Sequence, residues 1–204
     1  MKTFLFLLTL TATLAATDYP TREFQASLIT ARFDGGLNRQ SPLLDSLIRS
    51  PRTHHGYSLS FVSNRSAISG LKFEFSQLEN KTLVQGPQAS FTYRQEPLWL
   101  LFGTQLKRNR SSARVKPFLH FMGGASRVAV SSPGPACAAT LGLPTCPARF
   151  QSSRWSMAGV VGGGIDLRLN RRTDLRLFQL EYFPLNRYGA TLHSIRVGFG
   201  IVLH

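Results

Sequence analysis

The feature that most constrains the fold is an alternation of apolar and polar side chains that recurs in segments of about ten residues. It is most regular near the end of the chain, where Ile195, Val197 and Phe199 alternate with Arg196 and Gly198. Successive side chains of a β-strand point to opposite faces, so each such segment has one apolar and one polar face. The sequence therefore predicts an all-β fold whose strands lie between two different environments.

Eight segments share this pattern, and residues typical of turns separate them. They are Glu23 to Phe33, Gly56 to Val62, Ile68 to Leu78, Trp99 to Arg108, Val115 to Val128, Ser156 to Asn170, Thr173 to Tyr182 and His193 to Leu203. The connections between them alternate between long and short, beginning with a long one. This alternation is typical of barrels that cross an outer membrane, which have short turns on the periplasmic side and longer loops outside.

Two positions depart from a regular pattern. Residues 86–94 also alternate, and we interpret them as the rim extension of a long hairpin; if they spanned the membrane, the strand count would change. In the seventh segment Arg176 cannot share a face in perfect register with Gln179 and Glu181, so we predict a β-bulge near Leu177.

The start of the chain has the order of residues found in a secretory signal peptide. Lys2 is followed by an apolar run of about a dozen residues and then by Ala15 and Ala16. We expect residues 1–16 to be removed and residues 17–204 to form one domain. No later stretch is apolar over the roughly 18 residues of a membrane helix, so entry into a bilayer requires a closed barrel.

The last third of the chain also resembles a known family in its actual residues, beyond the alternation alone. Residues 162–170 (GGGIDLRLN), 174–182 (DLRLFQLEY) and 196–202 (RVGFGIV) resemble the last three strands of the OmpA-like outer-membrane β-barrel family of Gram-negative bacteria. The resemblance implies a monomeric, antiparallel, up-and-down barrel of about eight strands with both termini in the periplasm, inserted by the barrel assembly machinery. One departure is the ending, Leu203 and His204, where such barrels commonly close on an aromatic residue.

The polar face of each segment must line the interior, and it carries most of the charge in the segments. The side chains assigned to a lumen charge network are Lys72, Glu74, Lys107, Lys116, His120, Asp166, Arg168, Arg176, Glu181 and Arg196. These assignments place six cations against three carboxylates. Side chains nearly fill a barrel of eight strands, so the lumen is predicted to be a charged plug more than a pore.

Two further groups of residues mark the membrane boundary and the loops. Tyr57, Trp99, Trp155 and Tyr182 fall at the loop ends of their strands and are predicted to form an interface girdle. Cys137 and Cys146 lie in one long connection, where an oxidising compartment favours a loop disulfide over two free thiols. His54 and His55 are expected to be solvated in the first long connection.

The formal net charge of +14 limits the class of partner. So basic an exterior favours lipid headgroups, lipopolysaccharide or acidic polysaccharide, whereas the signal peptide and the lack of a basic helix argue against nucleic acid. We expect a structural, adhesive or envelope-interaction barrel with basic loops. The alternatives are a narrow anion-leaning channel, a lipid-modifying enzyme, or a soluble β-sandwich or lipocalin-like barrel.

Catalysis has little support in the sequence, and we expect no enzyme activity, cofactor or metal. His193 and Ser194 are adjacent and must face opposite sides of a strand, so they cannot form a dyad. His120 is interpreted as a structural histidine in a polar lumen.

Overall fold

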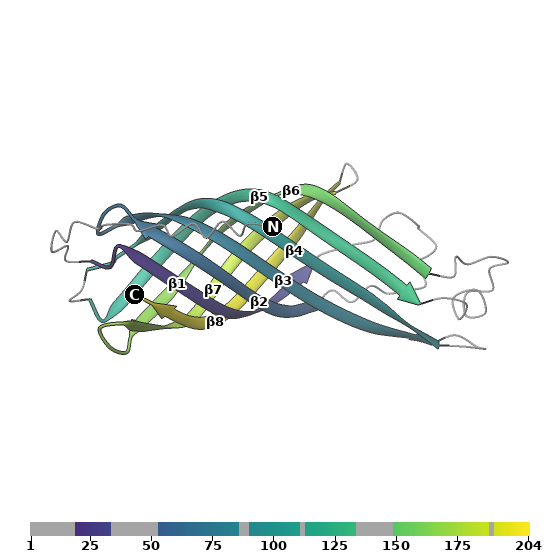
Figure 1. The fold of residues 1–204 in the computed structure, drawn as a ribbon, viewed down its shortest axis with the longest axis horizontal. Helices are drawn as coiled ribbons and strands as arrows, with labels where there is room; N and C mark the ends of the chain where they lie inside the picture. Colours follow the sequence, from purple (N-terminus) through teal and green to yellow (C-terminus); the bar gives the residue numbers. More distant parts are fainter. Residues whose placement is uncertain (1–18, 34–52, 86–89, 111–112, 134–148, 188–189) are drawn as a thin grey trace, which may run out of the picture.

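The chain forms one closed β-barrel of eight antiparallel strands (Figure 1). A computed structural model describes residues 19–33, 53–85, 90–110, 113–133, 149–187 and 190–204. The strands are β1 (Arg22–Phe33), β2 (Thr53–Asn64), β3 (Ser69–Gln85), β4 (Ser90–Lys107), β5 (Val115–Pro133), β6 (Arg149–Arg168), β7 (Thr173–Arg187) and β8 (Ala190–Leu203). The predicted fold class is confirmed. Residues 1–16, Cys137 and Cys146 lie outside the described residues.

The barrel closes by pairing its last strand with its first. Each strand pairs with the next in sequence, and β8 returns to β1 with Leu203 opposite Phe24. The start of β1 and the end of β8 therefore lie at the same end of the barrel, together with the short connections at residues 65–68, 108–114 and 169–172. This end corresponds to the periplasmic side of an outer-membrane barrel.

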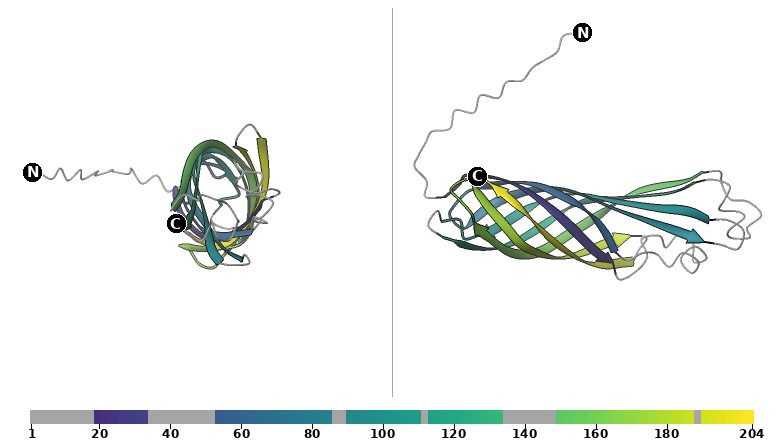
Figure 2. Two further views of the ribbon diagram at one scale, coloured as in Figure 1. Left: turned by 90° about the vertical axis from the view of Figure 1, so that its right-hand side faces the viewer. Right: turned by 90° about the horizontal axis from the view of Figure 1, so that it is seen from below.

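The four central strands are longer than the sequence segments that predicted them. β3 and β4 remain paired out to Gln85 and Ser90, and β5 and β6 out to Pro133 and Arg149. In Figures 1 and 2 they project well beyond the other strands at the end opposite the short turns. The alternation in residues 86–94 thus belongs in part to the extended β3–β4 hairpin, as predicted, and the strand count stays at eight.

The predicted irregularity in the seventh strand is present. The pairing of β7 with β8 shifts register between Arg176 and Gln179, and Leu177 and Phe178 are both exposed. The two consecutive outward residues allow Arg176 and Gln179 both to face the interior. The bulge near Leu177 is therefore confirmed.

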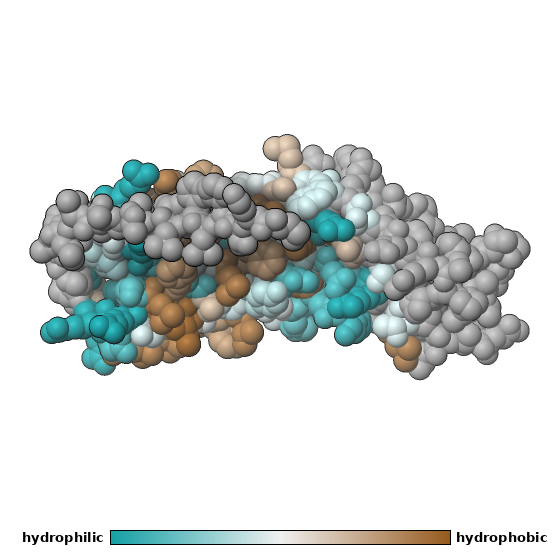
Figure 3. Space-filling view, in the orientation of Figure 1, coloured by the Kyte–Doolittle hydropathy of each residue, from teal (hydrophilic) through white to brown (hydrophobic). Residues whose placement is uncertain are grey.

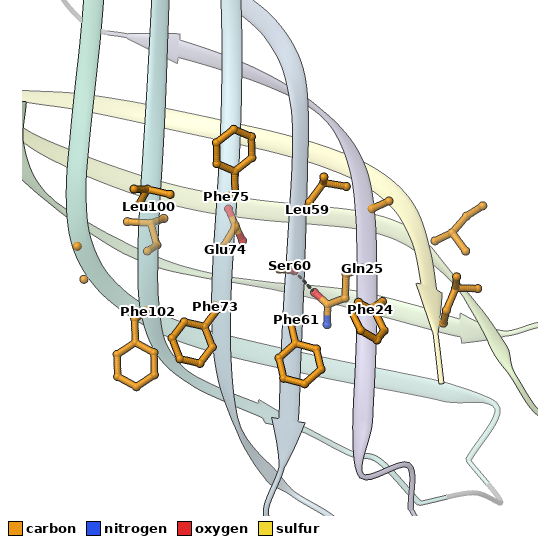
Figure 4. A pocket seen from close by; sticks show the side chains of 16 residues that line it. Phe24, Gln25, Leu59, Ser60, Phe61, Phe73, Glu74, Phe75, Leu100 and Phe102 are labelled. Atoms are coloured by element: carbon orange, nitrogen blue, oxygen red, sulfur yellow. Dashed lines mark hydrogen bonds between the residues drawn. The ribbon is translucent and has the colours of Figure 1, made fainter. Parts of the chain in front are cut away.

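The exterior of the wall is apolar and the interior is polar. Phe24, Phe61, Phe73 and Phe102 are neighbours in one row across β1 to β4 and point outward, whereas Gln25, Ser60 and Glu74 point inward (Figure 4). Phe24, Phe73 and Phe102 expose 61, 52 and 48% of their surface. Apolar side chains gather over the middle of the face in Figure 3, with hydrophilic residues to either side.

This distribution matches a wall in contact with lipid and differs from that of a soluble lipocalin-like barrel. No helix in the described part of the chain is long and apolar enough to cross a membrane.

Candidate functional site in the barrel interior

The interior holds nine of the ten residues that the alternation assigned to it. These nine side chains are at most 3% exposed: Lys72, Glu74, Lys107, Lys116, His120, Asp166, Arg176, Glu181 and Arg196. Arg168 is the exception and corrects the assignment. It stands half-exposed at the end of β6, where its Nε donates to the carbonyl oxygen of Asn170 in the following turn. As the last residue of β6, Arg168 faces the neighbouring turn instead of the interior, so parity alone misplaced this residue.

Among the described residues, three further charged or titratable side chains form ion pairs with the network at its short-turn end. Glu23 and Asp174 are fully buried, and the imidazole of His204 lies 2.9 Å from Asp174 Oδ2. Glu23 has the parity of Gln25 in β1, and Asp174 has the parity of Arg176 in β7, so the same alternation contained the signal for both. Nothing in the sequence pattern indicated that His204 reaches into the interior.

A lower cluster of ion pairs occupies the periplasmic half of the interior. Lys107 Nζ lies 2.9 Å from Glu23 and 3.0 Å from Asp166. Arg176 binds the Asp166 carboxylate with both Nε and a terminal nitrogen, at 2.9 and 3.1 Å. Lys116 Nζ lies 2.8 Å from Asp174. The lower cluster thus joins side chains from β1, β4, β5, β6 and β7 across the lumen.

An upper cluster centres on Arg196. Its guanidinium binds both Glu181 and Glu74 and donates to Ser76 Oγ at 2.8 Å. Lys72 pairs with Glu74 at 2.9 Å, and His120 Nε2 with Glu181 at 2.7 Å. These contacts tie β8 to strands on the far side of the barrel.

Gln179 connects the clusters, and Gln25 adds a further contact within the lower one. The Arg176 guanidinium donates to Gln25 at 2.9 Å and to Gln179 at 2.8 Å, and Gln179 donates in turn to Glu181 at 2.5 Å. The interior is therefore a continuous hydrogen-bonded network. Because every member is buried, removing one partner would leave a charge without compensation.

The charges of the interior balance. Among the described residues, five cations are buried (Lys72, Lys107, Lys116, Arg176 and Arg196) against five carboxylates (Glu23, Glu74, Asp166, Asp174 and Glu181). This corrects the expected excess of six cations over three carboxylates. Arg168 is not buried, which lowers the number of interior cations from six to five. Glu23 and Asp174 are buried, which raises the number of carboxylates from three to five. Balance has a physical reason, since an uncompensated charge in a dry interior is costly.

An aromatic layer covers the upper cluster and corrects the position of Trp99. Trp99 is 1% exposed and lies in the interior, with its ring centroid 5.0 Å from Phe183 and 6.4 Å from Phe33. The Arg196 guanidinium lies 5.7 Å from the Phe183 ring centroid. Trp99 has the parity of Leu101 and Gly103, so the alternation itself assigned it inward. Its place at the start of the predicted segment misled the girdle assignment, because β4 in fact begins at Ser90.

The other three girdle residues do face outward. Tyr57, Trp155 and Tyr182 expose 42, 52 and 42% of their surface. Tyr57 and Trp155 lie in one lateral row, which runs through Gln77, Leu98 and Arg127. Amphipathic rings at this level suit the boundary between lipid and water.

The histidines form no recognisable catalytic or metal centre within the described ranges. No group of three potential metal ligands is found there, and no hydrogen bond joins His120 to a serine. His193 is exposed and Ser194 buried, on opposite faces as predicted. His54 differs from expectation. It belongs to β2, where it is buried, with Nε2 2.9 Å from Gln95 Oε1.

Comparisons with known proteins agree with the architecture. No family model and no curated protein matches the sequence. Among solved structures, Neisserial surface protein A matches with a TM-score of 0.55 and 13% identity, covering 90% of this chain and 97% of that one. Ail, the attachment invasion locus protein of Yersinia pestis, in complex with the heparin analogue sucrose octasulfate, matches with a TM-score of 0.52 and 13% identity, covering 90 and 99%.

Identities this low establish the fold and nothing finer. The fold agrees with the apolar exterior, the polar network inside and the short turns at the end that holds both strand termini. The chain is thus an eight-stranded β-barrel of the outer-membrane type, with the architecture of the small OmpA-like barrels.

Proposed function

We propose that this protein is an outer-membrane anchor that presents a basic surface to anionic polysaccharide, such as lipopolysaccharide or a sulfated glycan. One observation carries the proposal. The sequence has 24 Lys and Arg and 10 Asp and Glu, and the buried interior takes five of each. Because the buried charges of the described residues cancel, the net charge, +13 once Lys2 is removed with the proposed signal peptide, is left to the exterior, the strand tips and the connections at both ends of the barrel. The part of it at the projecting end is available to a partner outside the cell.

The projecting end provides a suitable platform for this contact. Arg32 and Arg127 are exposed there, and Arg127 is the cross-strand neighbour of the outward Trp155. Lys81 and Arg94 also lie on the β3–β4 projection, each paired with Glu79. The paired strands hold these side chains on a rigid sheet, which lowers the entropic cost of binding.

The Yersinia pestis neighbour was solved with a sulfated saccharide analogue bound. That complex supports testing the same ligand class here. As further proposals, the barrel is inserted as a monomer by the barrel assembly machinery, residues 1–16 act as a signal peptide, and Cys137 and Cys146 form a loop disulfide.

Several observations argue against the two alternative functions, an anion-leaning channel and a lipid-modifying enzyme. The anion-leaning channel rested on a cationic excess that the interior does not have, and the Phe33, Trp99 and Phe183 layer lies over the network. A lipid-modifying enzyme would need a nucleophile within reach of His120, but Nε2 pairs with Glu181 and no described serine forms a hydrogen bond with Nδ1. We propose a role without turnover.

Binding of heparin fragments and lipopolysaccharide to the barrel in phospholipid nanodiscs tests the proposal. The variant Arg32→Ser with Arg127→Ser removes two exposed cations from the projecting end. Its matched control, Arg171→Ser with Arg172→Ser, removes two from a periplasmic turn. We expect binding that weakens with salt and a loss of roughly tenfold or more in the first variant alone, at about 1 kcal/mol per cation. Equal loss in both variants, or no binding by the wild type, would overturn the proposal.

A further inference from the structure

A groove in the outer wall lies on the side formed by β4 to β7, toward the end with the short turns. It encloses about 880 Å³, and Leu106, Leu119, Gly163 and Leu180 line its apolar part. Strand pairing sets these four residues in a single lateral row. Leu106 is opposite Leu119, Leu119 opposite Gly163, and Gly163 opposite Leu180. Gly163 brings no side chain of its own to this row, so the outward leucines on either side of it form the apolar surface.

The Leu119 side chain packs closely over Gly163. A Cβ placed on Gly163 would lie 2.7 Å from Leu119 Cδ2 and 2.6 Å from the Phe118 carbonyl oxygen, so a larger residue there would displace its neighbours. Leu119 and Leu180 expose about half of their surface beside it, at 54 and 53%. The groove therefore presents an apolar surface to lipid at this level of the wall.

Two arginines border the same groove at its periplasmic edge. Arg108 and Arg110 follow Leu106 at intervals of two residues and are both exposed. Two residues of extended chain span about 7 Å, so Arg108 lies about 7 Å from Leu106 along the strand direction, on the periplasmic side of the row of leucines. Within the described residues, neither arginine forms an ion pair with a carboxylate. Their charges are available to a ligand that lies in the groove.

The other exposed charged side chains at this end also favour binding of an anion. The other exposed or half-exposed charged side chains of the short-turn end, among the described residues, are all arginines: Arg22, Arg65, Arg114, Arg168, Arg171 and Arg172. The carboxylates nearby, such as Asp166 and Asp174, are buried and paired with cations inside. The exposed charged side chains described at this end are thus all positive.

We propose that this groove binds an anionic glycerophospholipid of the periplasmic leaflet. An acyl chain lies along the row of Leu106, Leu119 and Leu180 over Gly163, and the phosphate is held by Arg108 and Arg110. Guanidinium groups suit this role because they present several donors to a phosphate at once. The groove lies at the short-turn end, in the leaflet that holds phospholipid, which distinguishes this ligand from lipopolysaccharide in the outer leaflet.

Native mass spectrometry of the whole barrel with phosphatidylglycerol, and in parallel with zwitterionic phosphatidylcholine, tests the proposal. We expect the wild type to retain one phosphatidylglycerol in clear preference to phosphatidylcholine. Arg108→Ser with Arg110→Ser should reduce this retention roughly tenfold or more, since each cation near a membrane surface contributes on the order of a fivefold change. The control Arg171→Ser with Arg172→Ser removes the same charge at the same end and should retain the lipid.

A third variant tests the apolar part of the groove. Leu180→Trp enlarges an outward side chain beside Gly163, so it should lower retention of phosphatidylglycerol without altering the charge. Gel mobility before and after boiling verifies that each variant is folded. Equal retention of the two lipids by the wild type would reduce the groove to ordinary lipid contact and overturn the proposal. Equal loss in the two arginine pairs would show diffuse attraction in place of a site, and would overturn it as well.

Discussion

Arg196 illustrates how a single side chain in this barrel connects distant parts of the sequence. It is fully buried and binds Glu181, Glu74 and Ser76, of which the last two are about 120 residues away in sequence. Such a residue contributes little net energy relative to a well-packed apolar core, because burying charge is itself costly. Removing Arg196 would destabilise the fold, because the carboxylates of Glu181 and Glu74 would stay buried without their cation.

The variant Arg196→Met tests this coupling. We expect the free energy of unfolding to fall by about 3 to 5 kcal/mol, the usual cost of breaking a buried ion pair. Urea titration of the barrel in phospholipid vesicles, followed by gel mobility, measures it. The matched control Arg172→Met, in an exposed turn, should change stability by less than about 0.5 kcal/mol. Equal effects of the two substitutions would contradict the network as described.

Gly103 in β4 and Gly123 in β5 differ in how much room the neighbouring strand leaves for a side chain. A Cβ on Gly103 would lie 1.9 Å from the Phe121 carbonyl oxygen, whereas the nearest atom to a Cβ on Gly123 is 4.0 Å away. Gly103→Ala should therefore prevent the barrel from forming, and Gly123→Ala should leave the folded fraction unchanged. The heat-dependent gel shift of the refolded protein measures both, and a folded Gly103→Ala barrel would show that the wall is less tightly paired there.

At the scale of elements, the irregularity in β7 follows from the need to keep charged residues inside. Leu177 and Phe178 both face outward, so Arg176 and Gln179 can both face the network. The conflict between Arg176 and Glu181 in a regular strand was visible in the sequence, and it predicted the bulge. Strand lengths were less predictable, because the projecting parts of β3 to β6 lie beyond the segments that the membrane forces to alternate.

Deleting single residues from β7 tests the bulge. Removal of Leu177 leaves one outward residue between Arg176 and Gln179, so the strand becomes regular and every other side chain keeps its face. We expect this variant to fold. Removal of Leu180 instead makes Gln179 and Glu181 consecutive, which forces one of them toward lipid, so this variant should not fold. Gel mobility before and after boiling distinguishes the outcomes, and similar behaviour of the two deletions would argue against the bulge.

At the scale of the whole molecule, the balanced charges of the interior stabilise the barrel, and the net charge lies on its exterior. The lower cluster, the upper cluster and the aromatic layer follow one another along the lumen, and the net charge remains outside. The barrel can therefore vary its exterior without disturbing the balance that stabilises its wall.

The same arrangement predicts how the protein behaves in a planar bilayer. Purified wild-type barrel should give no discrete conductance steps and no anion selectivity, because paired charges and the Phe33, Trp99 and Phe183 layer occupy the lumen. A purified porin reconstituted in the same way provides the positive control. Reproducible anion-selective steps from the wild type would restore the channel hypothesis.

The sequence by itself determined the strands, their two faces and most of the buried charge, because side-chain alternation in a strand is a local property with a period of two. It could not determine which charges meet. Glu23 pairs with Lys107, 84 residues later, and Arg196 with Glu74, 122 residues earlier. Those contacts depend on the stagger of the strands around the closed barrel, which no single segment encodes. Closure also brought His204 into the interior and left Arg168 half-exposed at the end of β6, neither of which the alternation indicated.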